Sequence, residues 1–170
     1  IRKRFPLLEV TSAAEEKERV VTALKDLDGC GIPISLDTCR PEVLTAALHY
    51  DIALVNDISG LTDVGYAKAV ADSGLPAILM AADTVPGEPL TFAETEAAIS
   101  LVLSRAETYG VEDIILDPGV GKWTDARTSE ADWELCRRFS ALQEYNLPLL
   151  AAVSRKSFIG ECLNKPSHER

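Results

Sequence analysis

Several short apolar runs in this sequence end in side chains that could bind a small polar ligand. Asp37 follows the first run, Asn56 ends the second and Asp117 ends the fourth. A carboxylate accepts two parallel N–H bonds from an amino-amidine edge, as it does from arginine. If these ends converge, two carboxylates and an amide would together bind a planar heterocycle that carries such an edge.

The last apolar run is followed by two adjacent cations. Residues 148–153 read PLLAAV, and Ser154, Arg155 and Lys156 come directly after them. A fixed positive charge in this position suits an anionic leaving group or a ring carbonyl. Met80, near the end of the third run, adds a soft thioether. The predicted site therefore has an acidic half and a basic half.

These residues stand at the ends of predicted β-strands. The runs that are apolar on both faces, as buried parallel strands are, cover residues 32–36, 52–56, 76–81, 113–117 and 148–153. The segments with helical periodicity cover residues 13–27, 41–50, 62–74, 92–110, 129–145 and 158–163. This alternation predicts an α/β fold with a parallel sheet. A doubly wound sheet and part of a (β/α)₈ barrel both fit, and both bind ligands at the carboxyl ends of their strands.

The acidic and amide residues also have purely structural interpretations. Asp37-Thr38 could cap the helix that begins at Pro41, and Asn56-Asp57 could form a turn through side chain-to-backbone bonds. Asp117 is followed by Pro-Gly, which is a strong turn signal. We favour a ligand site because all three fall at one level of the predicted sheet, which independent caps and turns need not do.

The basic half has structural alternatives as well. Ser157 could cap the helix that follows it, which would leave Arg155 and Lys156 as a surface pair. Met80 could simply belong to the core. The common level of the strand ends again favours the ligand site.

Charge and composition exclude several partners. The chain has 17 Lys and Arg against 27 Asp and Glu, a formal charge of −10 at pH 7. Nucleic acids and anionic membranes need a concentrated basic face, so we expect neither as a partner. No run approaches the roughly 18 apolar residues of a membrane span. No C-x-x-C is present, and we expect a cytoplasmic protein whose cysteines are free thiols: Cys30, Cys39, Cys136 and Cys162.

An ordered set of motifs resembles a known family. IPISLDTCRPEV, VNDISG, AILM, IILDPGVG and LAAVSRKSFIG, at these spacings, resemble dihydropteroate synthase, of the pterin-binding (β/α)₈ TIM-barrel superfamily. The resemblance runs from about residue 14 to residue 163. It implies a transferase that joins 6-hydroxymethyl-7,8-dihydropterin diphosphate to an arylamine, usually p-aminobenzoate, and releases diphosphate. Mg²⁺ is expected only as a companion of the diphosphate substrate, with no metal site on the protein.

The resemblance also implies a role for each candidate residue. The residues that would contact the pterin are Asp37, Asn56, Met80 and Asp117. Lys156 would bond the pterin and steady the departing diphosphate, whereas Ser154 and Arg155 would lie beside the arylamine. Lys156 and Arg155 are thus the predicted catalytic residues.

Two departures from the family pattern point to a subgroup. Ala81 follows Met80 where bacterial members usually have His, and the loop DPGVGKWTDART replaces the usual continuation with Phe-Gly-Lys. These features resemble archaeal dihydropteroate synthase-related proteins, which are associated with methanopterin and whose arylamine would carry a ribose phosphate. Arg155, Lys122 or Arg127 would then bind the added phosphate.

The family's first two strands and its eighth have no counterpart in this sequence, nor does the R-x-H that the family uses to hold diphosphate. Five strands cannot close an eight-stranded barrel, and an open edge is a liability. We therefore expect residues 1–170 to be a single but incomplete pterin-binding domain of a longer protein. The alternative is that the open sheet pairs with another chain, as in a homodimer.

Two rival functions share the pterin-binding fold. Corrinoid-linked methyltransferases bind methyl-tetrahydrofolate with similar Asp and Asn residues, but they have no diphosphate to hold, so Lys156 favours the synthase. A non-catalytic pterin-binding module is the other alternative. The presence of Asp37, Asp117 and Lys156 argues against it, and the missing strands argue for it.

Overall fold

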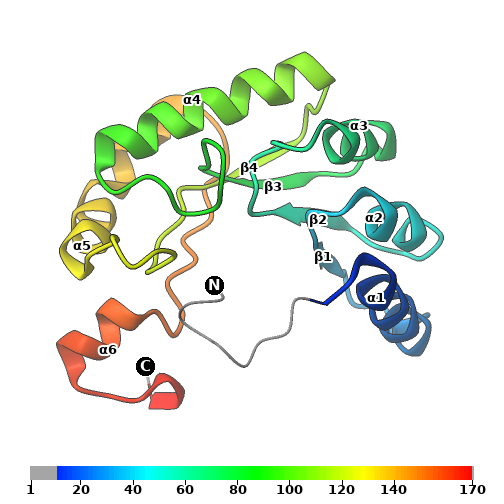
Figure 1. The fold of residues 1–170 in the computed structure, drawn as a ribbon, viewed down its shortest axis with the longest axis horizontal. Coiled ribbons are helices and arrows are strands. Elements are labelled where there is room, and N and C mark those ends of the chain that lie inside the picture. The colour runs from blue at the N-terminus through cyan, green and yellow to red at the C-terminus, as the bar shows by residue number, and fades with distance from the viewer. Residues whose placement is uncertain (1–10, 170) are drawn as a thin grey trace.

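A computed structural model describes residues 11–169 of the chain, in which short strands alternate with helices (Figure 1). The strands are β1 (Ser35–Asp37), β2 (Leu54–Asp57), β3 (Ala77–Met80) and β4 (Ile114–Asp117). The helices are α1 (Ala13–Leu27), α2 (Pro41–Ala47), α3 (Val64–Ser73), α4 (Phe92–Tyr109), α5 (Ser129–Arg138) and α6 (Ser157–Leu163), with 3₁₀ turns η1 (Phe139–Tyr145) and η2 (Ser167–Glu169). The predicted α/β alternation is confirmed.

The four strands form one parallel sheet in the order β1-β2-β3-β4, so each strand pairs with the next along the chain. Leu36 pairs in register with Val55, and Val55 with Ala77, and all three are buried. Their side chains pack in one core cluster with residues of α1 to α4, which line one side of the sheet in Figure 1. The opposite face of the sheet is therefore available for a site.

Local sequence signals explain where the helices begin and end. Thr91 and Glu94 form a reciprocal capping box at the start of α4. Gly74 and Gly110 end α3 and α4 at φ angles of 64° and 80°, in the left-handed region that glycine adopts without steric cost. The predicted helix over residues 129–145 is α-helical only as far as Arg138 and continues as the tighter η1.

The fifth predicted strand, residues 148–153, is only partly formed. Leu149 makes a single parallel bridge to Leu116, through bonds from Leu116 N to Pro148 O (2.9 Å) and from Leu150 N to Leu116 O (2.7 Å). Beyond this point the chain turns, with Val153 N bonded to Ala151 O at 2.8 Å. Among residues 11–169 no strand pairs with the other edge of this segment, so half of its backbone groups lack the ladder that would keep it extended.

The turn after β2 is fixed by a buried carboxylate. Asp57, which is fully buried, accepts hydrogen bonds from Ser59 N (2.8 Å), Ser59 Oγ (2.6 Å) and Leu61 N (2.7 Å). These bonds hold Leu61 at a φ of 60°, which is costly for a residue with a branched side chain. They also place Gly60 where a Cβ would lie 3.0 Å from the carbonyl oxygen of Met80. The turn that Asp57 forms therefore packs closely against the end of β3.

We expect Asp57→Ala to destabilise the fold by about 3 kcal/mol, because it leaves the buried Leu61 N–H and the partly buried Ser59 N–H without an acceptor. Urea unfolding followed by circular dichroism at pH 7 measures this cost. Asp72→Ala, at an exposed position on α3, is the matched control and should change the free energy of unfolding by less than about 0.5 kcal/mol. A similarly small cost for Asp57→Ala would show that the turn holds without its carboxylate.

An arginine of α4 joins two of the loops at the carboxyl ends of the strands. Arg105 Nη1 donates to Gly60 O and to Ala82 O, both at 3.0 Å, and its Nη2 donates to Asp83 O. Gly60 lies in the loop after β2, and the other two acceptors lie in the loop after β3. One guanidinium thus holds the two loops together.

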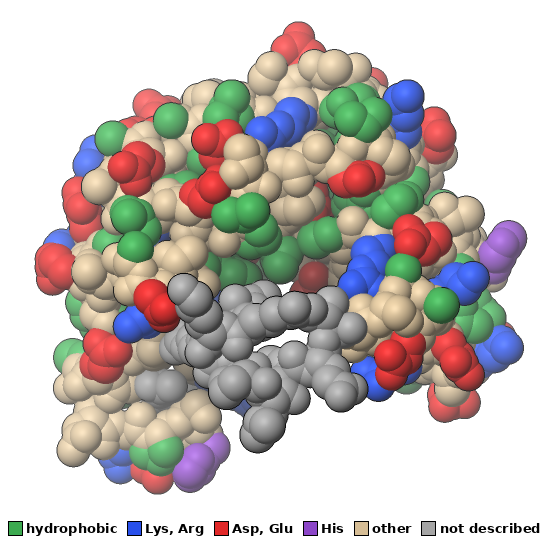
Figure 2. Space-filling model, in the orientation of Figure 1, with side chains coloured by type: hydrophobic (Ala, Val, Ile, Leu, Met, Phe, Trp, Pro, Cys, Tyr) green, Lys and Arg blue, Asp and Glu red, His purple; other side chains and the backbone are tan. Residues whose placement is uncertain are grey.

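The face shown in Figure 2 has no broad basic surface among the described residues. Acidic and basic side chains are interspersed over the helices, and hydrophobic side chains gather toward the middle of the view. All four cysteines are free thiols, as predicted. Within residues 11–169, none of the helices combines the length and the apolar character needed to cross a membrane.

Candidate functional site

The strand register brings the predicted pterin-contacting residues onto one face of the sheet. Asp37 pairs with Asn56, Asn56 with Ile78 and Ile78 with Ile115. Because side chains alternate along a strand, this row faces away from the helices. The next residues on this face are a second register pair, Met80 and Asp117. All four predicted residues therefore lie on the same face, at the carboxyl ends of their strands.

Asp37 and Asn56 interact directly. Burial raises the pKa of the Asp37 carboxyl above its usual 3.8, whereas a hydrogen bond with the Asn56 side chain lowers it in part. The charges of Asp57 and Glu16 raise it further. This burial is only partial, and the Asp37 residue as a whole remains exposed to solvent, since β1 is an edge strand of the described sheet. An exposed carboxylate beside an amide can accept N–H bonds from a ligand.

Asp117 both forms the predicted turn and carries a carboxylate on the site face. Its Oδ1 accepts from Gly119 N at 2.8 Å, so the predicted turn does form. Burial raises the pKa of Asp117, although the Gly119 bond and the positive charge of Lys156 oppose this rise. Gly119, at a φ of 78°, brings its backbone against Met80, whose Sδ lies 3.5 Å from where a Cβ would stand. The turn therefore also shapes the wall that Met80 forms.

Lys156 lies against the backbone of Gly121 in the loop after β4. A Cβ on Gly121 would stand 2.9 Å from Lys156 Cδ and 3.2 Å from Nζ, so only glycine leaves room for the lysine. The Nζ is also 5.2 Å from the centre of the Trp123 ring, within the range of a cation–π contact. The predicted cation is thus held on the acidic side of the site, beside Asp117.

Ser154 and Arg155 are exposed in the turn before α6. Arg155 has a φ of 60°, and among residues 11–169 its side chain has no ion-pair partner. The cap of α6 is Lys156, without a side-chain cap bond, and Ser157 is the first helical residue. The structural alternative in which Ser157 caps this helix is therefore wrong.

The alternatives for the first two strand ends are also resolved. The cap of α2 is Arg40, without a side-chain cap bond, so Asp37 does not cap this helix. Thr38 Oγ1 instead accepts from Arg40 N at 3.3 Å. The predicted turn at Asn56-Asp57 does form, through the carboxylate of Asp57, which leaves the Asn56 side chain on the site face.

Comparison with protein-family models matches residues 3–170 to the pterin binding enzyme family. The chain belongs to this family. It is 39% identical to the dihydropteroate synthase of Synechocystis sp. over 175 residues, which cover 95% of this chain and 58% of that protein. It is 33% identical to the dihydropteroate synthase of Escherichia coli, covering 94% of this chain and 59% of that protein.

Solved structures of pterin-binding enzymes share the fold. The Yersinia pestis DHPS with a pterine-sulfa conjugate matches with a TM-score of 0.82 and 29% identity, over 97% of this chain and 64% of that one. The Xanthomonas albilineans dihydropteroate synthase with 4-aminobenzoic acid matches with a TM-score of 0.83 and 29% identity, over 96% and 60%. The parallel sheet is thus part of a (β/α)₈ barrel, and the chain spans about 60% of these relatives' length.

The comparisons and the structure do not favour the predicted archaeal subgroup. The relatives named here are bacterial, although this chain lacks the His and the Phe-Gly-Lys expected of bacterial members. Arg127, one of the three cations predicted to bind a ribose phosphate, is only 3% exposed and is paired with Asp132. The guanidinium is therefore buried and paired inside the protein, so it is not available to bind a ligand phosphate.

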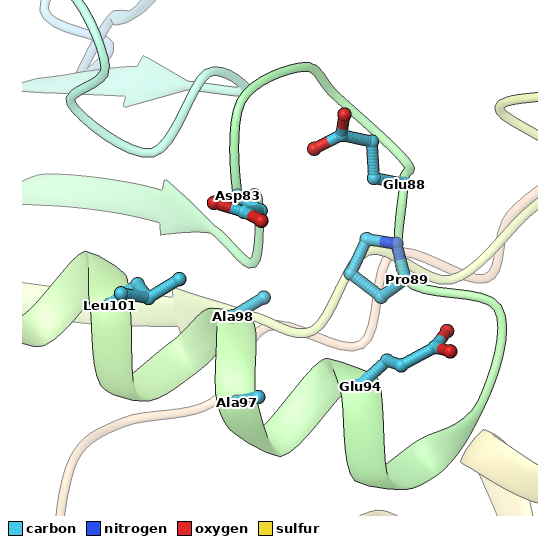
Figure 3. A pocket seen from close by; sticks show the side chains of 7 residues that line it. All are labelled: Asp83, Glu88, Pro89, Glu94, Ala97, Ala98 and Leu101. Atoms are coloured by element: carbon cyan, nitrogen blue, oxygen red, sulfur yellow. The ribbon is translucent and has the colours of Figure 1, made fainter.

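A separate hollow of about 260 Å³ lies between α4 and the loop after β3 (Figure 3). Its apolar floor is formed by residues of α4, including Ala97, Ala98 and Leu101. Glu88 at its rim is already engaged, because its carboxylate accepts from Thr84 N at 2.7 Å. None of the predicted site residues lines this hollow, and we assign it no role.

Two apolar residues and one loop residue of the site were not predicted. Ile78 and Ile115 are two residues before Met80 and Asp117, so the alternation of side chains along a strand would have placed them on the site face. Trp123 contacts Lys156, but it lies in a loop where no periodicity applies. The unusual Gly-Lys-Trp in place of Phe-Gly-Lys was the only available signal for it.

The raised pKa of Asp117 has a consequence for stability. A carboxyl with a raised folded-state pKa favours folding below its unfolded pKa, and that contribution is lost as the pH rises through the folded-state pKa. Asp117→Asn removes this dependence and keeps an acceptor for Gly119 N. We expect the variant without ligand to be at least as stable as wild type at pH 7, with a difference that shrinks toward pH 3. Urea unfolding of both proteins over this pH range measures it, and lower stability of the variant at pH 7 would contradict it.

Proposed function

We propose that this chain forms the pterin-binding part of a dihydropteroate synthase-type transferase of folate biosynthesis. The reaction joins the methylene of 6-hydroxymethyl-7,8-dihydropterin diphosphate to the nitrogen of an arylamine and releases diphosphate. The observation that carries this proposal is the convergence of Asp37, Asn56 and Asp117 on one face with Lys156 beside Asp117. The relatives, which include dihydropteroate synthases with a pterine-sulfa conjugate and with 4-aminobenzoic acid, support it.

The acidic residues suit the pterin ring and the charge that develops on it. The 2-amino group and the adjacent ring N–H form an amino-amidine edge, which the buried Asp117 carboxylate can accept in bidentate fashion. As the C–O bond to diphosphate breaks, the methylene carbon gains positive charge. Two nearby carboxylates stabilise this charge more in the transition state than in the ground state, which is the requirement for catalysis.

The basic residues suit the leaving group and the acceptor. Lys156 Nζ would neutralise charge on the departing diphosphate, while the lone pair of the arylamine nitrogen forms the new C–N bond and that nitrogen then loses a proton. Ser154 and Arg155, which are exposed in the adjoining turn, would meet the carboxylate of a p-aminobenzoate-type acceptor. Mg²⁺ would arrive with the diphosphate. Among the described residues no cluster of acidic, His or Cys side chains is arranged to hold a metal ion.

One observation favours a second candidate, a pterin-binding module without turnover. The chain spans only about 60% of the relatives' length, so groups from the rest of such proteins are not in this sequence. Calorimetric titration with a dihydropterin diphosphate, followed by assay of diphosphate release with p-aminobenzoate, separates the two candidates. Binding with release supports the transferase, and binding without release over hours supports the module. No binding at all would contradict both.

A further inference from the structure

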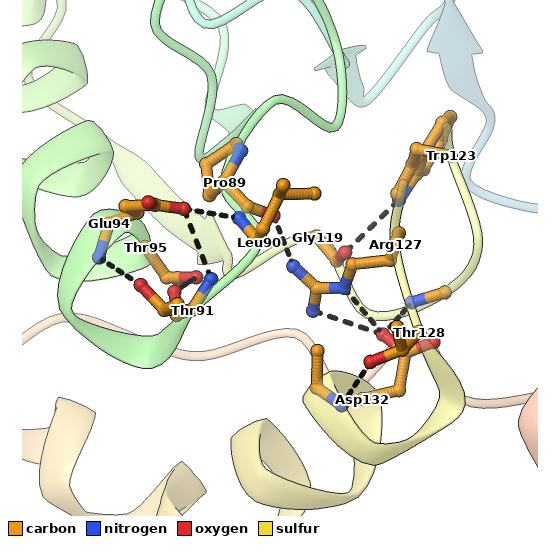
Figure 4. A network of polar contacts seen from close by, with 12 residues as sticks. Pro89, Leu90, Thr91, Glu94, Thr95, Gly119, Trp123, Arg127, Thr128 and Asp132 are labelled. Atoms are coloured by element: carbon orange, nitrogen blue, oxygen red, sulfur yellow. Dashed lines mark hydrogen bonds and ion pairs between the residues drawn. The ribbon is translucent and has the colours of Figure 1, made fainter. Parts of the chain in front are cut away.

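A buried ion pair that includes none of the predicted pterin-contacting residues joins two loops that border the site (Figure 4). Arg127 and Asp132 are 3% and 1% exposed, and both Nε and Nη2 of the arginine lie 3.0 Å from Asp132 Oδ1. Arg127 Nη1 also donates to the carbonyl of Pro89, in the loop after β3. One guanidinium thus ties the loop after β3 to the start of α5.

Stability alone does not explain this pair. Removing two charges from water costs several kcal/mol for each ion, and replacing a buried pair by apolar residues is often neutral or stabilising. Asp132 Oδ2 is buried and has no hydrogen-bond partner among residues 11–169, which adds a further cost. The pair therefore points to a role in fixing geometry.

The geometry that it fixes is the backbone under Lys156. Gly121 N donates to Asp132 Oδ1 at 2.9 Å, so the oxygen that pairs with Arg127 also holds this glycine. Gly121 adopts a φ of 122°, and the aliphatic stem of Lys156 occupies the space where its Cβ would be. The position of the lysine thus depends on the position of this one peptide.

A second contact ties the same loops together. Trp123 Nε1 donates to Gly119 O at 3.1 Å, which folds the indole back over the loop after β4. A Cβ on Gly87, in the loop after β3, would stand only 1.9 Å from Trp123 Cβ, so the tryptophan is seated directly on that glycine. Asp117 and Lys156 are therefore bordered by two loops that the ion pair and the tryptophan hold in one arrangement.

We propose that Arg127 and Asp132 are positioning residues that hold Lys156 beside Asp117 through the backbone of Gly121. Neither of them touches the substrate. The link from the pair to the lysine is a property of the protein alone, whereas its effect on a diphosphate-bearing pterin rests on the proposed function. A change in the pair should therefore alter the accessibility of Lys156 and the affinity for the diphosphate group more than the affinity for the pterin ring.

The test uses the full chain and a reporter that needs no substrate. Acetylation of Lys156 at fixed pH is followed by mass spectrometry, with the exposed Lys25 and Lys68 as internal references. Three variants are compared: Arg127→Met with Asp132→Leu, Asp132→Asn, and Glu130→Ala. The first removes the pair and the acceptor for Gly121 N. The second keeps an amide oxygen for Gly121, and the third removes an exposed ion pair with Arg137 on the same helix.

We expect the double variant to acetylate Lys156 at least about fivefold faster than wild type, and the other two variants to stay within about twofold. Circular dichroism verifies that each variant is folded. Unchanged acetylation in a folded double variant would overturn the proposal. If that variant does not fold, Gly121→Ala tests the same contact from the other side, because its methyl group would displace Lys156. Unchanged acetylation there would overturn the proposal as well.

Titration with a dihydropterin diphosphate and with the neutral 6-hydroxymethylpterin completes the test. In the double variant, we expect the affinity for the diphosphate compound to fall about tenfold and that for the neutral pterin by less than threefold. Equal losses for both compounds would contradict positioning through Lys156. Wild type could bind neither compound while Lys156 is still acetylated faster in the double variant than in wild type. In that case the proposed function fails and the positioning role stands.

Discussion

Asp117→Asn is expected to weaken the binding of a dihydropterin diphosphate analogue by about 30- to 150-fold. This corresponds to about 2–3 kcal/mol, the free energy lost when a charged bidentate hydrogen bond is removed from a buried site. The amide offers one oxygen where the carboxylate offers two, and its NH₂ group would face the donors of the pterin edge. Titration calorimetry of both proteins at pH 7 measures the change.

The structure makes this result easy to separate from damage to the fold. Asp117 accepts one internal bond, from Gly119 N, and Asn keeps that acceptor. Burial of the carboxyl opposes its ionised form, so the variant should lose affinity without losing stability. Asp113→Asn, at an exposed position just before β4, is the matched control and should leave the affinity unchanged. Unchanged affinity in Asp117→Asn would show that Asp-Pro-Gly serves only as a turn.

Wild-type affinity should also depend on pH in a defined direction. The carboxylate must be ionised to accept two N–H bonds, and burial raises the pKa at which it becomes protonated. Affinity should therefore fall as the pH is lowered through this raised pKa, at a higher pH than for an exposed aspartate.

The convergence of the site residues could be predicted because it follows from the fold class. In a parallel sheet that alternates with helices, all strands end at one edge, so Asp37, Asn56 and Asp117 had to lie close together. The alternation of side chains along β2 distinguishes Asn56 from Asp57. The two are neighbours on β2 and must face opposite sides, and the register with Asp37 puts Asn56 on the site face.

The fifth strand could not be judged from its composition. PLLAAV is as apolar as the runs that became β2 and β3, yet only Leu149 pairs with β4. Whether such a segment stays extended depends on partners along both of its edges, and these are contributed by residues distant in the sequence. Local periodicity contains no information about them.

The role of Arg127 was also beyond local reasoning. Sequence alone presents it as a charged residue in a polar loop, where exposure is the usual outcome. Its partners are Asp132 on the next helix and the Pro89 carbonyl in another loop, so its burial is a consequence of how two loops pack. Arg127 was predicted as a possible ligand of a substrate phosphate, but in the structure it forms a buried ion pair and holds two loops together.

Lys156→Ala is expected to separate the two halves of the site. Removing one charged donor from a developing anion typically lowers kcat by about 100-fold or more, whereas a neutral pterin loses at most one hydrogen bond, or about fivefold in affinity. We therefore expect diphosphate release to slow far more than the binding of 6-hydroxymethylpterin weakens. Release is followed by a coupled phosphate assay and binding by calorimetry.

The position of Lys156 explains why the two effects should differ. Its Nζ lies against Gly121 and near the Trp123 ring, and its charge acts on Asp117, so under the proposed function it would reach a group attached to the pterin. Lys165→Ala, which removes an exposed pair with Glu169, controls for the loss of one positive charge and should change neither quantity. If the chain binds without turnover, the Kd for the diphosphate compound replaces kcat in the comparison. Equal effects on the charged and neutral ligands would contradict a leaving-group role, because a lysine that contacts only the ring cannot distinguish between them.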